Sequence, residues 1–191
     1  MRDDEDLTDL IRAAAGGDRR AFEDLVLTKR ERVVRTAFQI TGNLEDAKDV
    51  AQGVFLRLWR VLQRFDLTKR FDTWLYRITV NAAIDHVRER GPKGFLQALP
   101  DDAGERLRDT SRGPEELLDL NELQGAFLRL AARLAPKQRA SFVLKEIEGL
   151  DTAEVARILG VTESTVRNHL LQARRVLREG LERDYPGWTK P

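Results

Sequence analysis

The 191-residue sequence has no cysteine and only two histidines. The absence of cysteine excludes disulfide bonds and thiolate metal sites, which favours a reducing compartment such as the cytoplasm. His86 and His169 lie far apart in the sequence, so we expect neither a metal site nor a bound cofactor. No nucleophile accompanies either histidine in a catalytic pattern, and we therefore expect no catalytic residues and no enzymatic activity.

Long apolar runs and a large charge of one sign are also lacking. No apolar stretch approaches membrane-spanning length, and the N-terminus is acidic where a signal peptide would be basic, so we expect a cytoplasmic protein without membrane insertion. The chain has 33 basic and 32 acidic residues, so an overall cationic field cannot bring it to nucleic acid. The charges are uneven, with an acidic middle and a basic end, which indicates a modular chain whose DNA binding is assisted by a partner.

The most informative stretch is residues 149–178. Asp151 can cap a short helix together with Glu154, Gly160 can end that helix in a left-handed conformation, and Thr162 can cap the next helix. The second helix has one apolar stripe, spaced four, three and four residues: Val166, Leu170, Ala173 and Leu177. This pattern is typical of a helix-turn-helix, in which the second helix lies in the DNA major groove.

The opposite face of the second helix carries side chains that bind DNA in such motifs. Arginine pairs with guanine, asparagine or glutamine with adenine, and hydroxyl groups with phosphates or bases. The candidate DNA-binding residues are Thr162, Ser164, Thr165, Arg167, Asn168, Gln172, Arg174 and Arg175. An ordinary helical hairpin with a solvated polar face is the alternative, but Glu163 is the only acid on this face, which favours DNA binding.

The residues before this stretch predict further helices and no strand. Apolar side chains recur at helical spacing over residues 7–15, 19–40, 44–65 and 71–90. Glycine marks the first two breaks between them, and the third break is a loop without helical periodicity. The surface of the third segment combines acidic, polar and large aromatic side chains: Asp46, Asp49, Gln52, Phe55 and Trp59. This surface is either a partner-docking site or, for the aromatic residues, plain core.

The fourth segment, with the loop before it, combines basic and aromatic residues. Lys69, Arg70, Arg77, Asn81, Arg88 and Arg90 lie on or near one side, with Trp74 and Tyr76 interleaved. Basic groups follow phosphates and aromatic rings stack on unpaired bases, so this side could bind single-stranded nucleic acid. A core helix with a charged, solvated side explains the same pattern equally well.

Residues 93–113 show no periodicity and are rich in Gly, Pro, Asp and Arg, which indicates a linker. Helices are expected to begin at Pro114 and at Pro136, ahead of the helix-turn-helix. The fold class is therefore all-α, with two small helical domains joined by a flexible linker.

Three motifs in this order resemble those of an RNA polymerase sigma factor of the extracytoplasmic-function (ECF) subfamily in the sigma-70 family. The motifs are DAKDVAQGVFLRLWR, FDTWLYRITVNAAIDHVRER and LAPKQRASFVLKEIEGLDTAEVARILGVTESTVRNHLLQARRVLR. The resemblance covers about residues 7–92 and 117–182. It implies a four-helix sigma region 2 domain over residues 1–92, a linker over 93–116, a helix-turn-helix region 4 domain over 117–185, and a tail over 186–191.

The resemblance also implies a division of labour in transcription initiation. The surface bearing Asp46, Asp49, Gln52, Phe55 and Trp59 matches the region that docks on core RNA polymerase. The helix-turn-helix matches the reader of the duplex −35 promoter element. The part that opens the −10 element and holds its non-template strand matches Asp66, Lys69, Arg70, Trp74, Arg77, Asn81, Asp85 and Arg88. An anti-sigma factor is a further candidate partner, and no cofactor is implied.

The sequence departs from the usual family pattern at four positions. Gly53 stands where an acid is common, and Asp72 stands where a basic residue is frequent, which puts a phosphate contact in doubt. Asn168 and His169 replace Ser and Arg, so the −35 preference cannot be taken from relatives. Two other functions compete with the sigma factor: a stand-alone helix-turn-helix regulator that binds duplex DNA without polymerase, and a helical scaffold without DNA contact.

Overall fold

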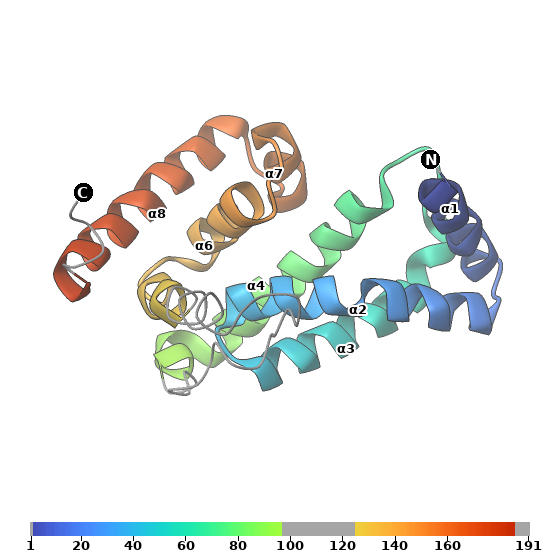
Figure 1. Cartoon of the computed structure of the whole chain (residues 1–191), viewed down its shortest axis with the longest axis horizontal. Coiled ribbons are helices and arrows are strands. Elements are labelled where there is room, and N and C mark those ends of the chain that lie inside the picture. The colour runs from blue at the N-terminus through green and yellow to red at the C-terminus, as the bar shows by residue number, and fades with distance from the viewer. Residues whose placement is uncertain (1, 97–124, 186–191) are drawn as a thin grey trace.

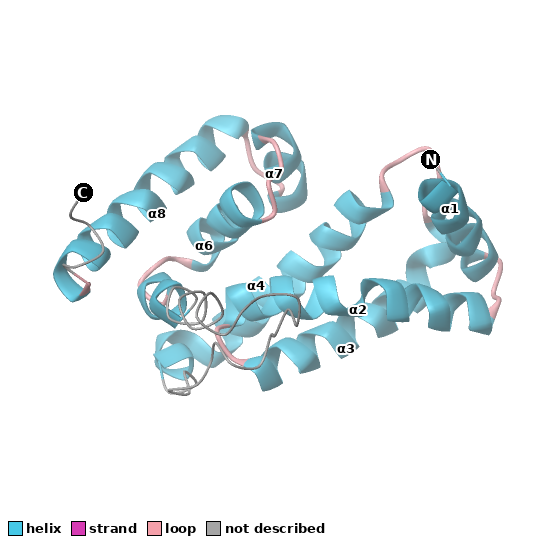
Figure 2. Cartoon of the chain, in the orientation of Figure 1, coloured by secondary structure: helices cyan, strands magenta, loops and turns pink. Residues whose placement is uncertain are grey.

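The computed structural model describes residues 2–96 and 125–185, and every regular element in these two ranges is a helix (Figure 2). The N-terminal module contains α1 (Arg2–Ala15), α2 (Arg19–Thr41), α3 (Leu44–Val61), the short 3-10 helix η1 (Leu62–Arg64) and α4 (Phe71–Leu96). The C-terminal module contains helical residues 125–131, α6 (Pro136–Phe142), the π-helical turn η2 (Val143–Ile147), α7 (Thr152–Leu159) and α8 (Glu163–Asp184). The predicted all-α fold class is confirmed.

Local capping signals set the helix ends in the N-terminal module. The Asp18 carboxylate accepts hydrogen bonds from the backbone N–H groups of Arg20 and Ala21, which begins α2. Gly42, with φ of 75°, ends α2 in the left-handed conformation that glycine adopts without strain. The Asn43 side chain then caps α3. These ends agree with the predicted breaks.

The end of α4 differs from the prediction. The helix breaks at Gly91, where φ is 69° and ψ is 176°, but helical structure resumes and continues to Leu96. The predicted linker therefore overlaps a helix at residues 93–96. The rest of that linker, residues 97–116, the helix expected from Pro114 up to residue 124, and the tail over 186–191 lie outside the described residues.

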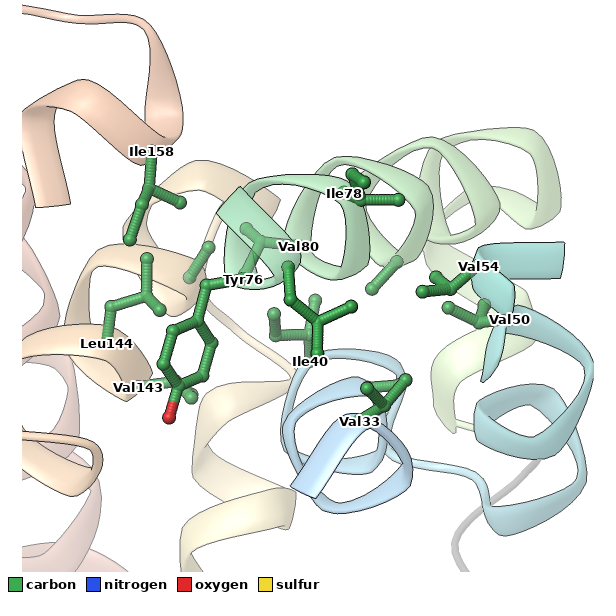
Figure 3. Packing of buried hydrophobic residues seen from close by; sticks show 14 of the residues in the cluster. Val33, Ile40, Val50, Val54, Tyr76, Ile78, Val80, Val143, Leu144 and Ile158 are labelled. Carbon is green, nitrogen blue, oxygen red and sulfur yellow. The ribbon is translucent and has the colours of Figure 1, made fainter. Parts of the chain in front are cut away.

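The two modules pack against each other (Figure 1). Within the N-terminal module α2 contacts α1, α3 and α4, and within the C-terminal module α8 contacts α6 and α7. Helix α4 also contacts α6 and α7, so one buried apolar cluster extends across both modules. Figure 3 shows this junction, where residues of the N-terminal and C-terminal modules meet: Ile40, Tyr76, Val80, Val143, Leu144 and Ile158. The sequence did not predict this contact.

A helix must be long and apolar to cross a membrane. Among the described residues, no helix is both long and apolar enough to cross a membrane.

Two glycines inside helices provide a matched test of the packing. A Cβ added at Gly53 in α3 would meet no atom within 4 Å, whereas one at Gly180 in α8 would lie 2.4 Å from Cδ2 of the buried Leu130. Gly53→Ala should raise the free energy of unfolding by about 0.5–1 kcal/mol, because glycine is a poor helix former. Gly180→Ala should lower it by about 1–2 kcal/mol, because overpacking outweighs that gain. Urea unfolding followed by circular dichroism measures both, and equal effects of the two variants would contradict this packing.

Candidate nucleic-acid interface

The helix-turn-helix forms as its capping residues predict. The Asp151 carboxylate accepts a hydrogen bond from the Glu154 N–H at 2.7 Å, and the Glu154 carboxylate accepts one from the Asp151 N–H at 3.4 Å. Gly160 ends α7 with φ of 62°. Thr162 begins α8, where its Oγ1 accepts from the Thr165 N–H at 3.2 Å. The reciprocal bonds at Asp151 begin α7, and the Thr162 bond satisfies one of the free N–H donors at the start of α8. Gly160 and Thr162 together define the turn between α7 and α8.

Burial of the apolar stripe determines which side of α8 faces outward. All four predicted stripe residues, Val166, Leu170, Ala173 and Leu177, are buried. Of the predicted DNA-contacting residues, two are half-buried, Thr165 and Gln172. Six are exposed: Thr162, Ser164, Arg167, Asn168, Arg174 and Arg175. The structure therefore presents these side chains together on an accessible polar surface.

Two of the arginines on this surface form ion pairs. Arg167 lies 3.4 Å from Glu163 in the preceding turn, and Arg174 lies 2.6 Å from Glu146 in η2. Both arginine side chains are more than half exposed. Exposed pairs of this kind contribute little to stability, so a DNA phosphate or base can replace the carboxylate at small cost.

His169 follows Asn168 in α8 and contacts α6. Ser141 Oγ lies 3.1 Å from His169 Nδ1 and 2.8 Å from the Lys137 carbonyl oxygen. Burial, together with the nearby charge of Lys137, lowers the pKa of His169 and favours the neutral ring.

The loop before α4 is shaped by Asp66. Its carboxylate accepts hydrogen bonds from the Thr68 hydroxyl at 2.7 Å and from the Thr68 N–H at 3.0 Å. These bonds lower the pKa of Asp66 and keep the carboxylate charged, and the bond from the Thr68 hydroxyl has the largest effect. The resulting turn leaves Leu67, Lys69 and Arg70 exposed. Asp66, Lys69 and Arg70 were predicted at this site, whereas Leu67 was missed although it is a large apolar residue in a polar loop.

The remaining −10 candidates share one face of α4. Trp74, Arg77, Asn81, Asp85 and Arg88 are spaced three, four, four and three residues, which aligns them along the helix. Arg77, Asp85 and Arg88 are exposed, while Trp74 and Asn81 are half-buried.

The Trp74 ring is held by other aromatic residues. Its centroid lies 4.7 Å from that of Phe65 and 6.0 Å from that of Phe71. These contacts orient the indole at the start of α4, directly after the loop formed by Asp66 and Thr68.

Asp72 has a structural role that accounts for its departure from the family pattern. Its carboxylate lies 2.7 Å from Lys29 Nζ and 3.1 Å from Arg32, both in α2. A carboxylate in the first turn of α4 is also favoured by the helix dipole. Asp72 therefore ties the start of α4 to α2.

The predicted docking surface on α3 is only partly exposed. Asp49, Gln52 and Trp59 are exposed, and Phe55 is half-buried. Asp46 is only 4% exposed and binds side chains of α4: its Oδ2 lies 2.8 Å from Arg90 and its Oδ1 lies 3.4 Å from His86. In this conformation Asp46 joins α3 to α4 rather than facing solvent.

The sequence reasoning missed large apolar side chains that are exposed on α2 and α3. Leu56 in α3 is 56% exposed, and Leu27 in α2 is 67% exposed. The Trp59 ring packs on Phe22 of α2 with centroids 4.8 Å apart. The position of Leu56 outside the buried stripe of α3 was the available signal for its exposure.

Comparison with known proteins agrees with this architecture. The family described as "Sigma-70 region 2" matches residues 25–92, and the family "Sigma-70, region 4" matches residues 124–177. The ECF RNA polymerase sigma factor SigW of Bacillus subtilis is 32% identical over 178 residues, which are 90% of this chain and 94% of SigW. The ECF RNA polymerase sigma factor SigE of Mycolicibacterium smegmatis is 38% identical over 171 residues, 87% of this chain, and the match spans 65% of SigE.

A solved structure gives the same result for the fold. CnrH, in complex with the cytosolic domain of CnrY, has a TM-score of 0.66 and 26% identity, and the match covers 93% of this chain and 97% of that chain.

The fold and the outward polar face of α8 define a helical DNA-binding protein of the helix-turn-helix class. With the sequence relatives, this chain belongs to the ECF sigma factors of the sigma-70 family.

Proposed function

We propose that this chain is a transcription initiation factor that binds core RNA polymerase and directs it to specific promoters. The observation that carries the proposal is the outward face of α8, where arginine, asparagine and hydroxyl side chains line a capped and buried recognition helix. The C-terminal module reads the −35 element as duplex DNA. The N-terminal module opens the −10 element and holds its non-template strand.

Recognition of the −35 element uses direct contacts in the major groove. Ser164, Arg167 and Asn168 lie in the first two turns of α8, which is the part of a recognition helix that reaches base edges. Arg174 and Arg175 lie one to two turns further on, where phosphates of the same groove can be neutralised.

Opening of the −10 element requires stabilisation of an unpaired strand. Separating the strands costs stacking and pairing energy, which binding of the displaced strand offsets. Trp74 offers an aromatic surface beside the loop of residues 66–70, and Arg77 and Arg88 continue along the same face with Asn81 between them. Binding alone performs this step, so we propose no covalent chemistry and no enzymatic role.

Association with polymerase explains the near-neutral charge of the chain. A net charge of +1 gives little attraction to DNA, so polymerase supplies much of that affinity.

We propose that Asp49, Gln52, Phe55 and Trp59 on α3 form the docking surface, with Leu56 beside them. The site of action is then the cytoplasm. An anti-sigma factor is a second proposed partner, because CnrH is known in complex with the cytosolic domain of CnrY.

Transcription from a promoter library tests the proposal. Purified chain added to core polymerase should give transcripts from a small set of related sequences, and core alone should give none. Arg167→Ala or Asn168→Ala should weaken binding of the holoenzyme to the selected promoters by roughly 1–3 kcal/mol. Each variant should also relax the base preference at one −35 position. Glu179→Ala, on an exposed part of α8 outside the proposed site, is the control. An unchanged promoter ranking would contradict base reading by these residues, and tight duplex binding without polymerase would indicate a stand-alone regulator instead.

The docking surface is tested separately from DNA reading. Asp49→Ala combined with Trp59→Ala should weaken binding to core polymerase by at least about tenfold, because aromatic and charged residues at an interface centre carry most of its affinity. Helix content and binding of the −35 duplex should stay as in the wild type. Glu23→Ala, an exposed acid on α2, is the matched control. Unaltered holoenzyme assembly in a pull-down titration would show that the pair has no docking role.

A further inference from the structure

One large apolar side chain lies on the outward face of α8. Leu171 is 64% exposed, and among the residues of α8 it is the only large apolar side chain that is exposed. The adjacent Leu170 belongs to the buried stripe, so the packing of the helix does not require a second leucine here. An explanation for Leu171 has to come from what the outward face of α8 contacts.

The residues one turn away from Leu171 are those proposed to bind DNA. Arg167 and Asn168 lie four and three residues before it, and Arg174 and Arg175 lie three and four residues after it. Side chains at these spacings are neighbours on the surface of a helix, and all four are exposed. Leu171 therefore lies at the centre of the surface proposed to read the −35 element.

The neighbouring arginines leave this leucine accessible. Arg167 lies 3.4 Å from Glu163 at the start of α8, and Arg174 lies 2.6 Å from Glu146 in η2. Both guanidinium groups are thus bound to acids, and the apolar side chain between them stays open to a ligand.

An apolar side chain in the major groove needs an apolar partner. Base edges in this groove present hydrogen-bond donors, hydrogen-bond acceptors and one methyl group, the C5 methyl of thymine. A leucine that covers a donor or acceptor removes its water without replacing the hydrogen bond, which is unfavourable. Contact between a leucine and the thymine methyl instead removes two apolar groups from water.

We propose that Leu171 is a specificity-determining residue that contacts the C5 methyl group of a thymine in the −35 element. The inference rests on the proposed function, and it adds a base that the polar residues of α8 do not account for. Leu171 lies four residues beyond Arg167, about 6 Å along the helix axis at ~1.5 Å per residue. At ~3.4 Å per base pair, the thymine lies roughly one to two base pairs from the pair that Arg167 contacts.

Replacement of thymine by uracil tests the contact, because it removes the methyl group and keeps the hydrogen-bonding groups of the base. Binding of the holoenzyme to a selected promoter is measured with each −35 thymine, on either strand, replaced in turn by deoxyuridine. With the wild-type chain, one replacement near the base pair read by Arg167 should weaken binding about fourfold, as expected for one buried methyl group.

Variants of Leu171 show whether this residue makes the contact. Leu171→Ala should weaken binding to the unmodified promoter by a similar factor and abolish the effect of that deoxyuridine, because the coupling disappears when either group is absent. Leu171→Met, which keeps an apolar side chain of similar size, should retain the effect. Helix content should not change, since Leu171 is exposed.

Leu27→Ala is the matched control. Leu27 is also an exposed leucine, at 67%, but it lies on α2, where its neighbours one turn away include the acids Glu23, Asp24 and Glu31. Whatever its effect on overall affinity, Leu27→Ala should leave the ratio of affinities for the thymine and uracil promoters as in the wild type.

The outcomes separate this inference from the proposed function. If Leu171→Ala and the wild type respond equally to every deoxyuridine, Leu171 contacts no thymine methyl and the proposal fails. It fails as well if no −35 thymine is sensitive in the wild type, although promoter-specific transcription would then still support the proposed function. Absence of any promoter-specific transcript from the wild-type holoenzyme would refute the proposed function itself.

Discussion

One buried guanidinium group joins the ends of helices from both modules. Arg139 in α6 is 2% exposed, and it donates to the Ala131 carbonyl at 2.8 Å and to the Ile40 carbonyl, near the end of α2, at 2.5 Å. Carbonyls at helix C-termini lack intrahelical partners and carry partial negative charge, so a cation is favoured there. Burial lowers the pKa of Arg139 to about 10, which leaves the group charged at neutral pH. Its position fixes α6, and with it the helix-turn-helix, relative to the core of the N-terminal module.

Polar and apolar contacts at this junction hold the two modules together. Arg139 binds carbonyl oxygens of both modules, and the Glu148 carboxylate accepts hydrogen bonds from the Tyr76 and Thr36 hydroxyls. The same junction brings Glu154 within 2.9 Å of Arg70, whose side chain remains 77% exposed.

The sequence predicted the features that depend on near neighbours. Asp151, Gly160 and Thr162 define the helix-turn-helix through bonds spanning a few residues, and the buried stripe of α8 follows from helical spacing alone. Asp46 and Asp72 could not be interpreted in this way, because their partners, Arg90 and Lys29, are 44 and 43 residues away. The junction of the modules was equally inaccessible, since Tyr76 and Glu148 are 72 residues apart and each has a sequence context typical of an ordinary helix.

The central claim is that this chain enables polymerase to separate the strands of the −10 element while the helix-turn-helix remains on the −35 element. Permanganate footprinting of a selected promoter measures this directly, because permanganate oxidises unpaired thymines. The account predicts reactive thymines confined to the −10 region when core polymerase and the chain are both present. Thymines that remain unreactive in a complex bound to the promoter would contradict it.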